Sequence, residues 1–357
     1  MAKRYYLGGA ISTMSAQQWK QFQYTKDPDK IITKIIGRRF QEYRSRWKKA
    51  SQLRCFQKYP IHLDFELHYG CNLRCPQCIL QVDRRELQPH HPYSASRKPG
   101  RISLEKFKEI IDEGVANGLS SITLTVNNEP LMLPNLIDYA AYAKQKGVLD
   151  IIIITNGELL TEKLSKQIIE SGVTKLYFSV DAANEETYKK IRKNGDFKTV
   201  VNNIAAFHSI RKKMKKQLPV TRVSFVKSKI NEHEEKQFIE FWAKRADFIS
   251  IQAFTSPAIG YSNEQPLMQE YHIDNKDLKE LGPCPQPYQR LTIYHDGSVH
   301  PCCHWSGATL IVGNIHTDSI YAIWNSKRMK SLRKEINSRS ASPQECRLCR
   351  QAVFGKQ

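Results

Sequence analysis

The alternation of strand-like and helix-like segments is the feature that most constrains how this chain folds. From residue 61 onward, six apolar runs typical of buried strands are separated by amphipathic segments. Strands joined in this way form a parallel sheet with right-handed crossovers, either an open barrel or a doubly wound sheet, and periodicity alone does not choose between them. The expected strands are Ile61–Leu67, Ser121–Val126, Asp150–Thr155, Lys175–Val180, Val220–Val226 and Phe248–Ala253.

Differences in composition and in the apolar pattern divide the chain into three parts. Residues 1–60 are polar and basic with scattered aromatic residues, which predicts a helical N-terminal extension. The α/β core spans residues 61–255. In residues 256–357, prolines and glycines interrupt the apolar pattern, and Asp296–Gly297 between two short apolar runs predicts a β-hairpin.

Local signals predict where several helices begin. Ser103 is expected to cap a helix whose apolar face begins at Leu104. Asn231 and Glu234 resemble a capping box ahead of another apolar face. In the C-terminal part, a single helix is expected across residues 320–332.

Composition narrows the class of protein. The chain has 357 residues and is 40% hydrophobic, enough for one large domain and an appendage. Its apolar runs are too short to cross a bilayer and its N-terminus lacks the apolar stretch of a signal peptide, so we expect a cytoplasmic protein. The formal charge of +20 favours anionic partners. No recognised RNA-binding signature accompanies that charge, so a nucleic-acid partner is not expected.

Nine cysteines, an odd number, point in a reducing compartment to metal ligation or catalysis rather than to disulfides. Directly after the first expected strand, Cys71, Cys75 and Cys78 form a Cys-x3-Cys-x2-Cys triplet. Three thiolates on one loop hold three irons of a cubane cluster and leave the fourth iron open for a substrate or cofactor. Structural zinc is the alternative, with a fourth ligand from a nearby histidine: His68, His90 or His91.

A second set of cysteines follows the expected hairpin and consists of Cys284, Cys302, Cys346 and Cys349. Cys303 adjoins Cys302, and neighbouring side chains on an extended segment point in opposite directions, so we expect Cys302 rather than Cys303 to be the ligand. Four thiolates also suit a zinc ribbon, because the spacing does not distinguish the metals.

With the triplet placed after the first strand, the chain resembles the radical SAM superfamily over residues 61–253. The resemblance implies a partial (β/α)6 TIM-like barrel and a 4Fe-4S cluster on Cys71, Cys75 and Cys78 whose open iron binds S-adenosylmethionine (SAM). It also implies reductive cleavage of SAM to a 5'-deoxyadenosyl radical that abstracts hydrogen from an unactivated carbon. The electron would come from a donor such as flavodoxin or ferredoxin.

Further matches to the family follow successive strands, where the active sites of parallel barrels gather. Asn127-Asn128-Glu129-Pro130 stands where the family has Gly-Gly-Glu-Pro, and both glycines are replaced by asparagine. Gln77 replaces an aromatic residue that the family often places against the adenine. The resemblance assigns cofactor binding to these residues: Asn128, Glu129, Asn156, Ser179, Asp181 and Arg192.

Residues 284–349 resemble the SPASM/twitch accessory domains of radical SAM enzymes. The further cysteines of the longer SPASM pattern do not follow Cys349, so the resemblance implies one auxiliary 4Fe-4S cluster, for two clusters in all. Four protein ligands leave this cluster no open iron, which suits electron transfer.

These features favour oxidation or epimerisation of a small anionic or carbohydrate-type substrate, with oxidation slightly preferred. In epimerases of the superfamily a non-cluster cysteine donates a hydrogen atom, and the two thiols left for that role are Cys55 and Cys303. Modification of a ribosomally made peptide is the alternative, and a non-enzymatic RNA-binding or electron-carrier protein is a remote one. The basic segment 81–101 is either a lid or anion-binding arm over the site, or a disordered loop.

Overall fold

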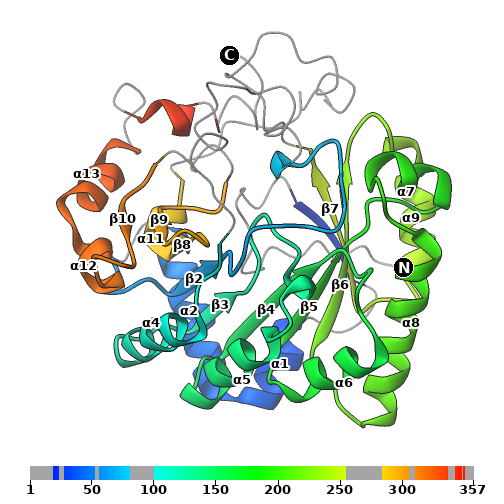
Figure 1. The fold of residues 1–357 in the computed structure, drawn as a ribbon, viewed down its shortest axis with the longest axis horizontal. Helices are drawn as coiled ribbons and strands as arrows, with labels where there is room; N and C mark the ends of the chain where they lie inside the picture. The colour runs from blue at the N-terminus through cyan, green and yellow to red at the C-terminus, as the bar shows by residue number, and fades with distance from the viewer. Residues whose placement is uncertain are drawn as a thin grey trace.

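A computed structural model of the chain describes residues 19–23, 28–52, 56–80, 100–254, 284–304, 310–336, 342–347 and 349. Its centre is a ten-stranded sheet (Figure 1) with the order β1-β7-β6-β5-β4-β3-β2-β8-β9-β10. Strands β2 to β7 are mutually parallel and coincide with the six expected strands. They are β2 (His62–Phe65), β3 (Ser121–Thr123), β4 (Asp150–Thr155), β5 (Lys175–Ser179), β6 (Val220–Lys227) and β7 (Phe248–Ala253).

The order of these six strands decides the architecture. A doubly wound sheet reverses its strand order at a switch point, whereas β2 to β7 follow one another without reversal. The expected fold class, a partial (β/α)6 TIM-like barrel, is therefore confirmed.

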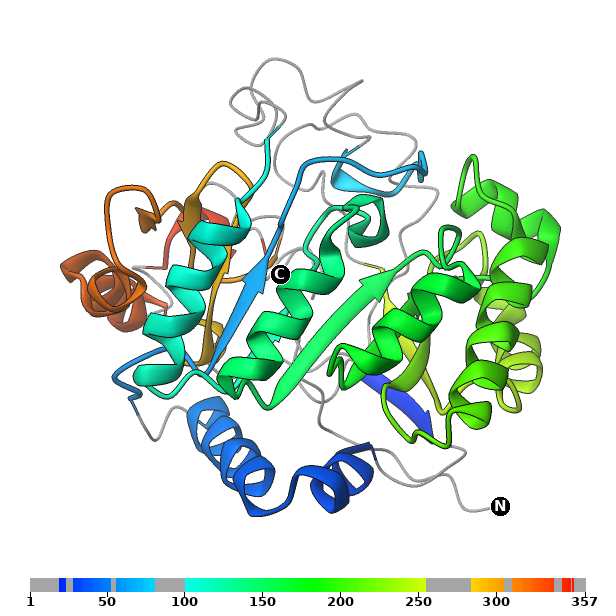
Figure 2. The same cartoon turned by 60° about the horizontal axis from the view of Figure 1, so that its bottom comes forward.

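Helices between the strands cover the outer face of the sheet, as the row of α4, α5 and α6 in Figure 2 shows. Leu63 and Phe65 of β2 face this layer, and the rings of Phe65 and Phe107 pack edge to face 4.9 Å apart. The elements are α4 (Leu104–Ala116), η1 (Pro130–Met132), α5 (Leu136–Lys146), α6 (Glu162–Glu170), α7 (Glu185–Ile191), α8 (Phe197–Lys213), η2 (Glu232–Glu234) and α9 (Glu235–Trp242).

The opposite face of β2 is polar, because side chains alternate across a strand. His62, Asp64 and Glu66 are all buried there. On the neighbouring strands the same face carries further buried polar residues: Ser121, Thr123, Lys175, Arg222, Ser224 and Ser250. The inner surface of this barrel is thus largely polar.

Both edges of the six-stranded unit are extended. On the β2 side, β8 (Arg290–Ile293) pairs in parallel, and β9 (Ser298–His300) and β10 (Gly313–Asn314) follow antiparallel. The expected hairpin at Asp296–Gly297 is present, with Gly297 at φ 86°. On the other side, β1 (Trp19–Gln23) pairs antiparallel with β7, which the sequence did not predict. The C-terminal part therefore continues the sheet of the core.

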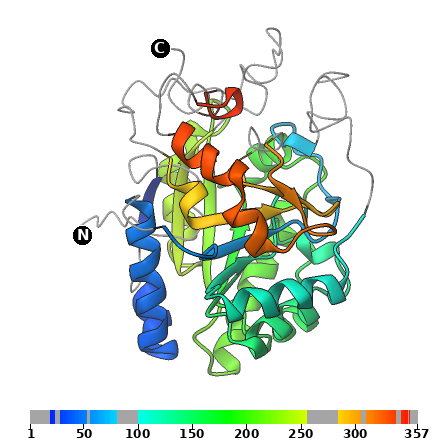
Figure 3. The same ribbon diagram turned by 90° about the vertical axis from the view of Figure 1, so that its left-hand side faces the viewer.

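Short helices complete the C-terminal part: α11 (Gln286–Gln289), α12 (Ile320–Asn325) and α13 (Lys327–Glu335). Figures 1 and 3 show α12 and α13, in orange, beside the β10 edge of the sheet. The carboxylate of Glu113, from α4, accepts hydrogen bonds from the backbone N–H groups of Ile320 and Tyr321. A core residue thus caps α12 of the C-terminal part.

Two N-terminal helices, α1 (Pro28–Ile36) and α2 (Arg38–Ser51), confirm the expected helical extension. They run across the amino-terminal end of the barrel (Figure 2, dark blue). Phe40, Tyr43 and Trp47 form one apolar cluster with residues at the starts of strands, including Val220 and Phe248.

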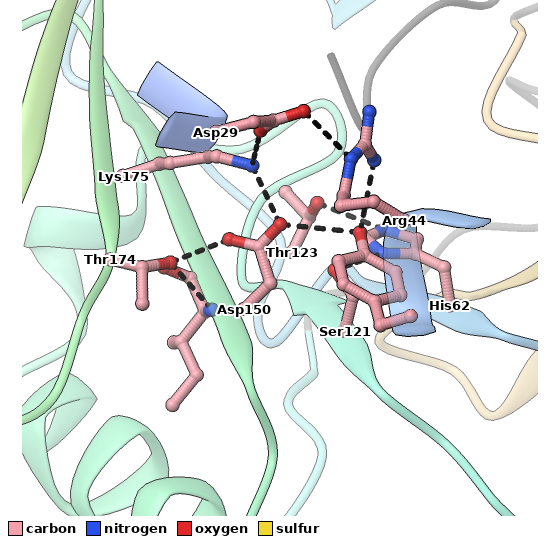
Figure 4. A network of polar contacts seen from close by, with 10 residues as sticks. Asp29, Arg44, His62, Ser121, Thr123, Asp150, Thr174 and Lys175 are labelled. Atoms are coloured by element: carbon pink, nitrogen blue, oxygen red, sulfur yellow. Dashed lines mark hydrogen bonds and ion pairs between the residues drawn. The ribbon is translucent and has the colours of Figure 1, made fainter. Parts of the chain in front are cut away.

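A buried polar network connects helices α1 and α2 to the strands of the barrel (Figure 4). The ammonium group of Lys175 lies 2.6 Å from Oδ2 of Asp150 and 3.8 Å from Oδ1 of Asp29. Asp29 also accepts a 2.8 Å hydrogen bond from Arg44, and Tyr43 donates to Asp150 at 3.2 Å. Two carboxylates thus face two cations, so the network is neutral although its residues lie inside the protein.

Local predictions had mixed outcomes. Ser103 caps α4 by accepting from Lys106 N–H at 3.1 Å, as expected. The capping box of Asn231 and Glu234 is wrong, because both side chains bond instead to the segment that follows β5. Asn231 donates to the Asp181 carbonyl and Glu234 accepts from Ala183 N–H.

The single helix expected across residues 320–332 is also wrong. The chain leaves helical geometry at Ser326, whose ψ is 158°. The Ser326 hydroxyl accepts from Met329 N–H at 3.2 Å and starts a second helix. No helix in the described ranges is long and apolar enough to span a bilayer.

Candidate active site

The loop after β2 places Cys71, Cys75 and Cys78 at the carboxyl end of the strand. The N–H of Cys78 donates to the Cys75 carbonyl at 3.0 Å, and Leu73 N–H donates to the Cys71 sulfur at 3.4 Å. Burial raises the pKa of Cys71 to about 11 and that of Cys78 to about 12. The thiolates that an iron–sulfur cluster needs therefore form when metal displaces the thiol protons.

Arg192 lies against this loop, at the end of α7. One of its terminal nitrogens bonds to the Asp181 carboxylate, and the other is 3.8 Å from the Cys75 sulfur. Burial lowers the pKa of Arg192, but Asp181 and Cys75 outweigh it and raise the pKa above its usual value. Asp181 is held in turn by Val226 N–H at 2.7 Å. The guanidinium is thus a fixed positive charge beside a cluster ligand.

The segment leading to the cysteines bonds at alternate residues to the segment after β3. Glu66 accepts from Asn127 N–H at 3.1 Å, His68 donates to the Glu129 carbonyl at 2.9 Å, and the Gly70 carbonyl accepts from Glu129 N–H at 2.9 Å. The cysteine loop and the Asn127-Asn128-Glu129-Pro130 segment are consequently positioned as one unit.

The Glu129 carboxylate turns into the protein and is only 2% exposed. It accepts hydrogen bonds from Thr155 Oγ1 at 2.6 Å, Asn156 N–H at 2.8 Å and Leu131 N–H at 3.1 Å. Burial nevertheless raises the pKa of Glu129 to about 7. An ammonium group bound nearby would stabilise the ionised form. In the structure this side chain also fixes the end of β4.

Asn156 connects the end of β4 to the cysteine loop. Its side-chain amide donates to Asn72 Oδ1 at 2.8 Å and lies 3.9 Å from the Cys71 sulfur. Ser179 is partly exposed at the end of β5 and pairs in register with Ser224 of β6. The structure thus brings the residues predicted after β3, β4 and β5 to the carboxyl ends of these strands, around one loop.

Buried polar atoms in this region fit a polar cofactor. Asn128 Nδ2, Arg192 Nε and Ser224 Oγ are buried and have no hydrogen-bond partner within the described ranges. Such atoms are rare in folded proteins unless a ligand or water satisfies them. They suit a molecule with carboxylate and hydroxyl groups, as SAM has.

The second cysteine set converges on Cys302. Burial is the largest cause of the raised pKa of Cys302, and a further increase comes from the nearby thiols of Cys284, Cys303, Cys349 and Cys346. Within the part of the chain that is described, no three His, Cys, Asp or Glu side chains group as ligands of a single metal ion. A cubane cluster instead distributes its thiolates over several irons.

Cys303 has a different environment from Cys302. Its sulfur lies 3.8 Å from a terminal nitrogen of Arg290, which pairs at 3.1 Å with Asp64 on the inner face of the barrel. Burial, with a smaller effect from Asp64, raises the pKa of Cys303 to about 12. The Cys303 sulfur thus contacts the Asp64–Arg290 pair on the inner face of the barrel, whereas Cys302 lies near the other cysteines of the C-terminal part. Cys55 and residues 81–99 lie outside the described residues.

The sequence reasoning did not identify His295, two residues after the end of β8. Its Nδ1 lies 2.7 Å from Oε1 of Glu66, and both side chains are buried. The sequence signal was the position of His295 just before the Asp296–Gly297 turn, at the end of a strand.

Comparison with known families gives two separate matches. Residues 65–241 match the radical SAM superfamily, and residues 284–350 match an iron–sulfur cluster-binding SPASM domain. The chain belongs to the radical SAM superfamily. As a radical SAM protein with a SPASM domain, it uses SAM and two 4Fe-4S clusters.

Individual relatives are distant. A GTP 3',8-cyclase of Thermodesulfovibrio yellowstonii is 28% identical over 212 residues, 59% of each chain. The subtilosin biosynthesis protein AlbA of Bacillus subtilis is 25% identical over 295 residues, which cover 76% of this chain and 61% of AlbA. The radical SAM chain described here spans about half the length of the curated relatives it matches.

Solved structures show the same fold. AdoMet-bound anSMEcpe is 16% identical, with a TM-score of 0.55 over 82% of this chain and 85% of that one. Streptococcus suis SuiB bound to its precursor peptide SuiA is 13% identical, with a TM-score of 0.55 over 88% of this chain and 74% of that one.

Proposed function

We propose that this radical SAM enzyme removes a hydrogen atom from a small polar, carbohydrate-type substrate at the mouth of the barrel and yields a two-electron oxidised product. The observation that carries this proposal is the presence of two cysteine sets on the strands that flank β8. Cys71, Cys75 and Cys78 follow β2 on one side of β8, and Cys302, near the other cysteines of the C-terminal set, follows β9 on its other side.

The residues around the first set would bind and orient the cofactor. Bound SAM and its cluster supply the carbon radical. Arg192 provides a positive charge for the cofactor's carboxylate, and Asp181 holds that guanidinium in place. Asn128 offers a buried amide donor, and Asn156 fixes the loop next to Cys71. Ser179 contributes a hydroxyl at the end of β5.

Two observations support a small polar substrate. The inner face of the barrel is lined by buried polar residues, among them His62, Asp64 and Arg222, where an apolar ligand would leave these groups poorly solvated. The net charge of +20 favours an anionic molecule. A flavodoxin or ferredoxin in the cytoplasm would be a suitable electron donor.

Oxidation requires that the substrate radical lose one electron to an acceptor and one proton to a general base such as a His or Asp side chain. A cluster held by Cys284, Cys302, Cys346 and Cys349 has no open iron, which suits it to accept the electron. Epimerisation would instead require a hydrogen atom from a thiol, and Cys303 and Cys55 remain the candidates. We favour oxidation because the Cys303 sulfur contacts Arg290 at the start of β8, beside the start of β2, whereas the SAM-binding cysteine loop follows the carboxyl end of β2.

The substrate class is tested by screening sugar phosphates, nucleotide sugars and GTP for stimulation of 5'-deoxyadenosine formation above the rate without substrate. Once a stimulating compound is found, the reaction is run in deuterium oxide with wild type, Cys303→Ala and Cys55→Ala. A two-electron oxidised product that neither change affects supports the proposal. Deuterium at an inverted carbon, lost in one variant, would establish epimerisation instead.

A second candidate is the modification of a ribosomally made peptide. The similarity to AlbA, a bacteriocin biosynthesis protein, extends over 76% of this chain and favours it. In the same screen, stimulation by peptides encoded beside the gene, and none by phosphorylated small molecules, would select this candidate.

A further inference from the structure

A buried contact joins the auxiliary domain to the barrel. His295 follows β8, and Glu66 immediately follows β2, the strand with which β8 pairs. Their side chains are 0% and 1% exposed and lie 2.7 Å apart, from Nδ1 to Oε1. An ionised carboxylate only accepts hydrogen bonds, so the imidazole donates this one.

The other oxygen of Glu66 reaches the proposed cofactor-binding segment. Oε2 accepts the backbone N–H of Asn127 at 3.1 Å, two residues before Glu129. The ring of Tyr69 also packs on the ring of His295, with the two ring centroids 5.0 Å apart. Tyr69 in turn packs in the apolar cluster that includes Cys71 and Cys78. His295 therefore contacts both Glu66, which bonds to the Asn127 backbone, and Tyr69, which packs beside the cysteine loop.

The imidazole also fixes which way the Glu66 carboxylate faces. Because one oxygen is bound by His295, the other is directed at Asn127 N–H. Without the imidazole, Oε1 loses this donor, so the buried carboxylate changes rotamer to recover a hydrogen bond there, and this moves Oε2 away from Asn127 N–H. The backbone at Asn127 and Asn128 would then lose a fixed acceptor at the place where the cofactor is expected to bind.

We infer that His295 is a positioning residue through which the auxiliary domain holds the SAM-binding segment, so that SAM affinity depends on the His295–Glu66 contact. This inference rests on the proposed assignment of residues 127–130 to SAM binding. It gives the auxiliary domain a role besides electron transfer.

The test compares two substitutions at one position. In His295→Asn the side-chain amide nitrogen occupies about the place of Nδ1 and still donates to Glu66, whereas His295→Leu retains bulk and removes the donor. SAM binding to reconstituted protein is measured by equilibrium dialysis, together with the change that SAM causes in the EPR spectrum of the reduced cluster. We expect His295→Leu to weaken SAM binding about tenfold and His295→Asn to remain within about threefold of wild type.

Two further proteins make the result specific. His233→Leu alters a histidine whose side chain is 68% exposed and should bind SAM as wild type does. In a Glu66→Leu background, His295→Leu should cost little more, because the acceptor of the contact is already absent. Iron content is measured in every protein.

The inference is overturned if His295→Leu binds SAM like wild type. It is equally overturned if His295→Asn and His295→Leu lose affinity to the same extent together with iron, since that pattern shows a general packing defect. If fully loaded wild type does not bind SAM at all, the assignment of the site itself fails, and the inference with it.

Discussion

The buried network beneath the barrel makes a quantitative prediction for Lys175→Met. Lys175 is 1% exposed, Asp150 is 0% exposed, and their charged atoms are 2.6 Å apart. The substitution keeps the aliphatic bulk, and the side-chain donors that then remain to Asp150 among the described residues are the hydroxyl groups of Tyr43 and Thr174. Removing one partner of a buried ion pair costs about 3–5 kcal/mol, and we expect that loss in the free energy of unfolding.

Urea unfolding monitored by circular dichroism, under anaerobic conditions, measures the effect. Lys189→Met is the matched control, because its pair with Glu185 is 62% and 59% exposed and contributes less than about 1 kcal/mol. The double variant Lys175→Met/Asp150→Asn removes both charges and should be more stable than Lys175→Met alone. A loss below about 1 kcal/mol for Lys175→Met, or a double variant that is less stable still, would refute the reasoning.

Three further predictions concern the metal sites, the cofactor and pH. Reconstituted protein should hold about eight irons, and Cys302→Ala should lose about four of them while Cys303→Ala keeps all, as iron analysis would show; equal loss in both would contradict the assignment. Glu129→Ala should weaken SAM binding by about 1–3 kcal/mol in equilibrium dialysis. A wild-type affinity would show that Glu129 only helps to form the turn and does not contribute to SAM binding. Burial raises the pKa of Asp64, but Arg290 and His62 outweigh it and lower the pKa to about 2. The stabilisation from Asp64 is therefore complete above about pH 4 and lost as pH falls toward 2, so acid unfolding should be less steep in Asp64→Asn, and an unchanged acid limb would argue against this pairing.

The six parallel strands and the cysteine loop were predictable because their signals are local. The run from His62 to Phe65 combines β propensity with alternation, and the triplet that follows has a spacing that requires no knowledge of distant residues. The polar inner face was not predicted, although His62, Asp64 and Glu66 occupy every second position of the same run.

The contacts that escaped prediction join residues far apart in the chain. His295 and Glu66 are separated by 229 positions, and Tyr43 and Asp150 by 107, so no periodic signal links them. The false capping box has the same origin. Asn231 and Glu234 have the correct local spacing, but partners after β5 compete successfully for both side chains.

The assignment of the cysteine loop as the SAM-cleaving site is tested most directly by reductive cleavage of SAM. Anaerobically reconstituted wild type, given dithionite and SAM without substrate, should form 5'-deoxyadenosine and methionine in equal amounts. The variant with Cys71, Cys75 and Cys78 all changed to Ala should form neither, while keeping about half of the iron. Stoichiometric zinc at both sites in place of iron, or equal 5'-deoxyadenosine from wild type and this variant, would contradict the account.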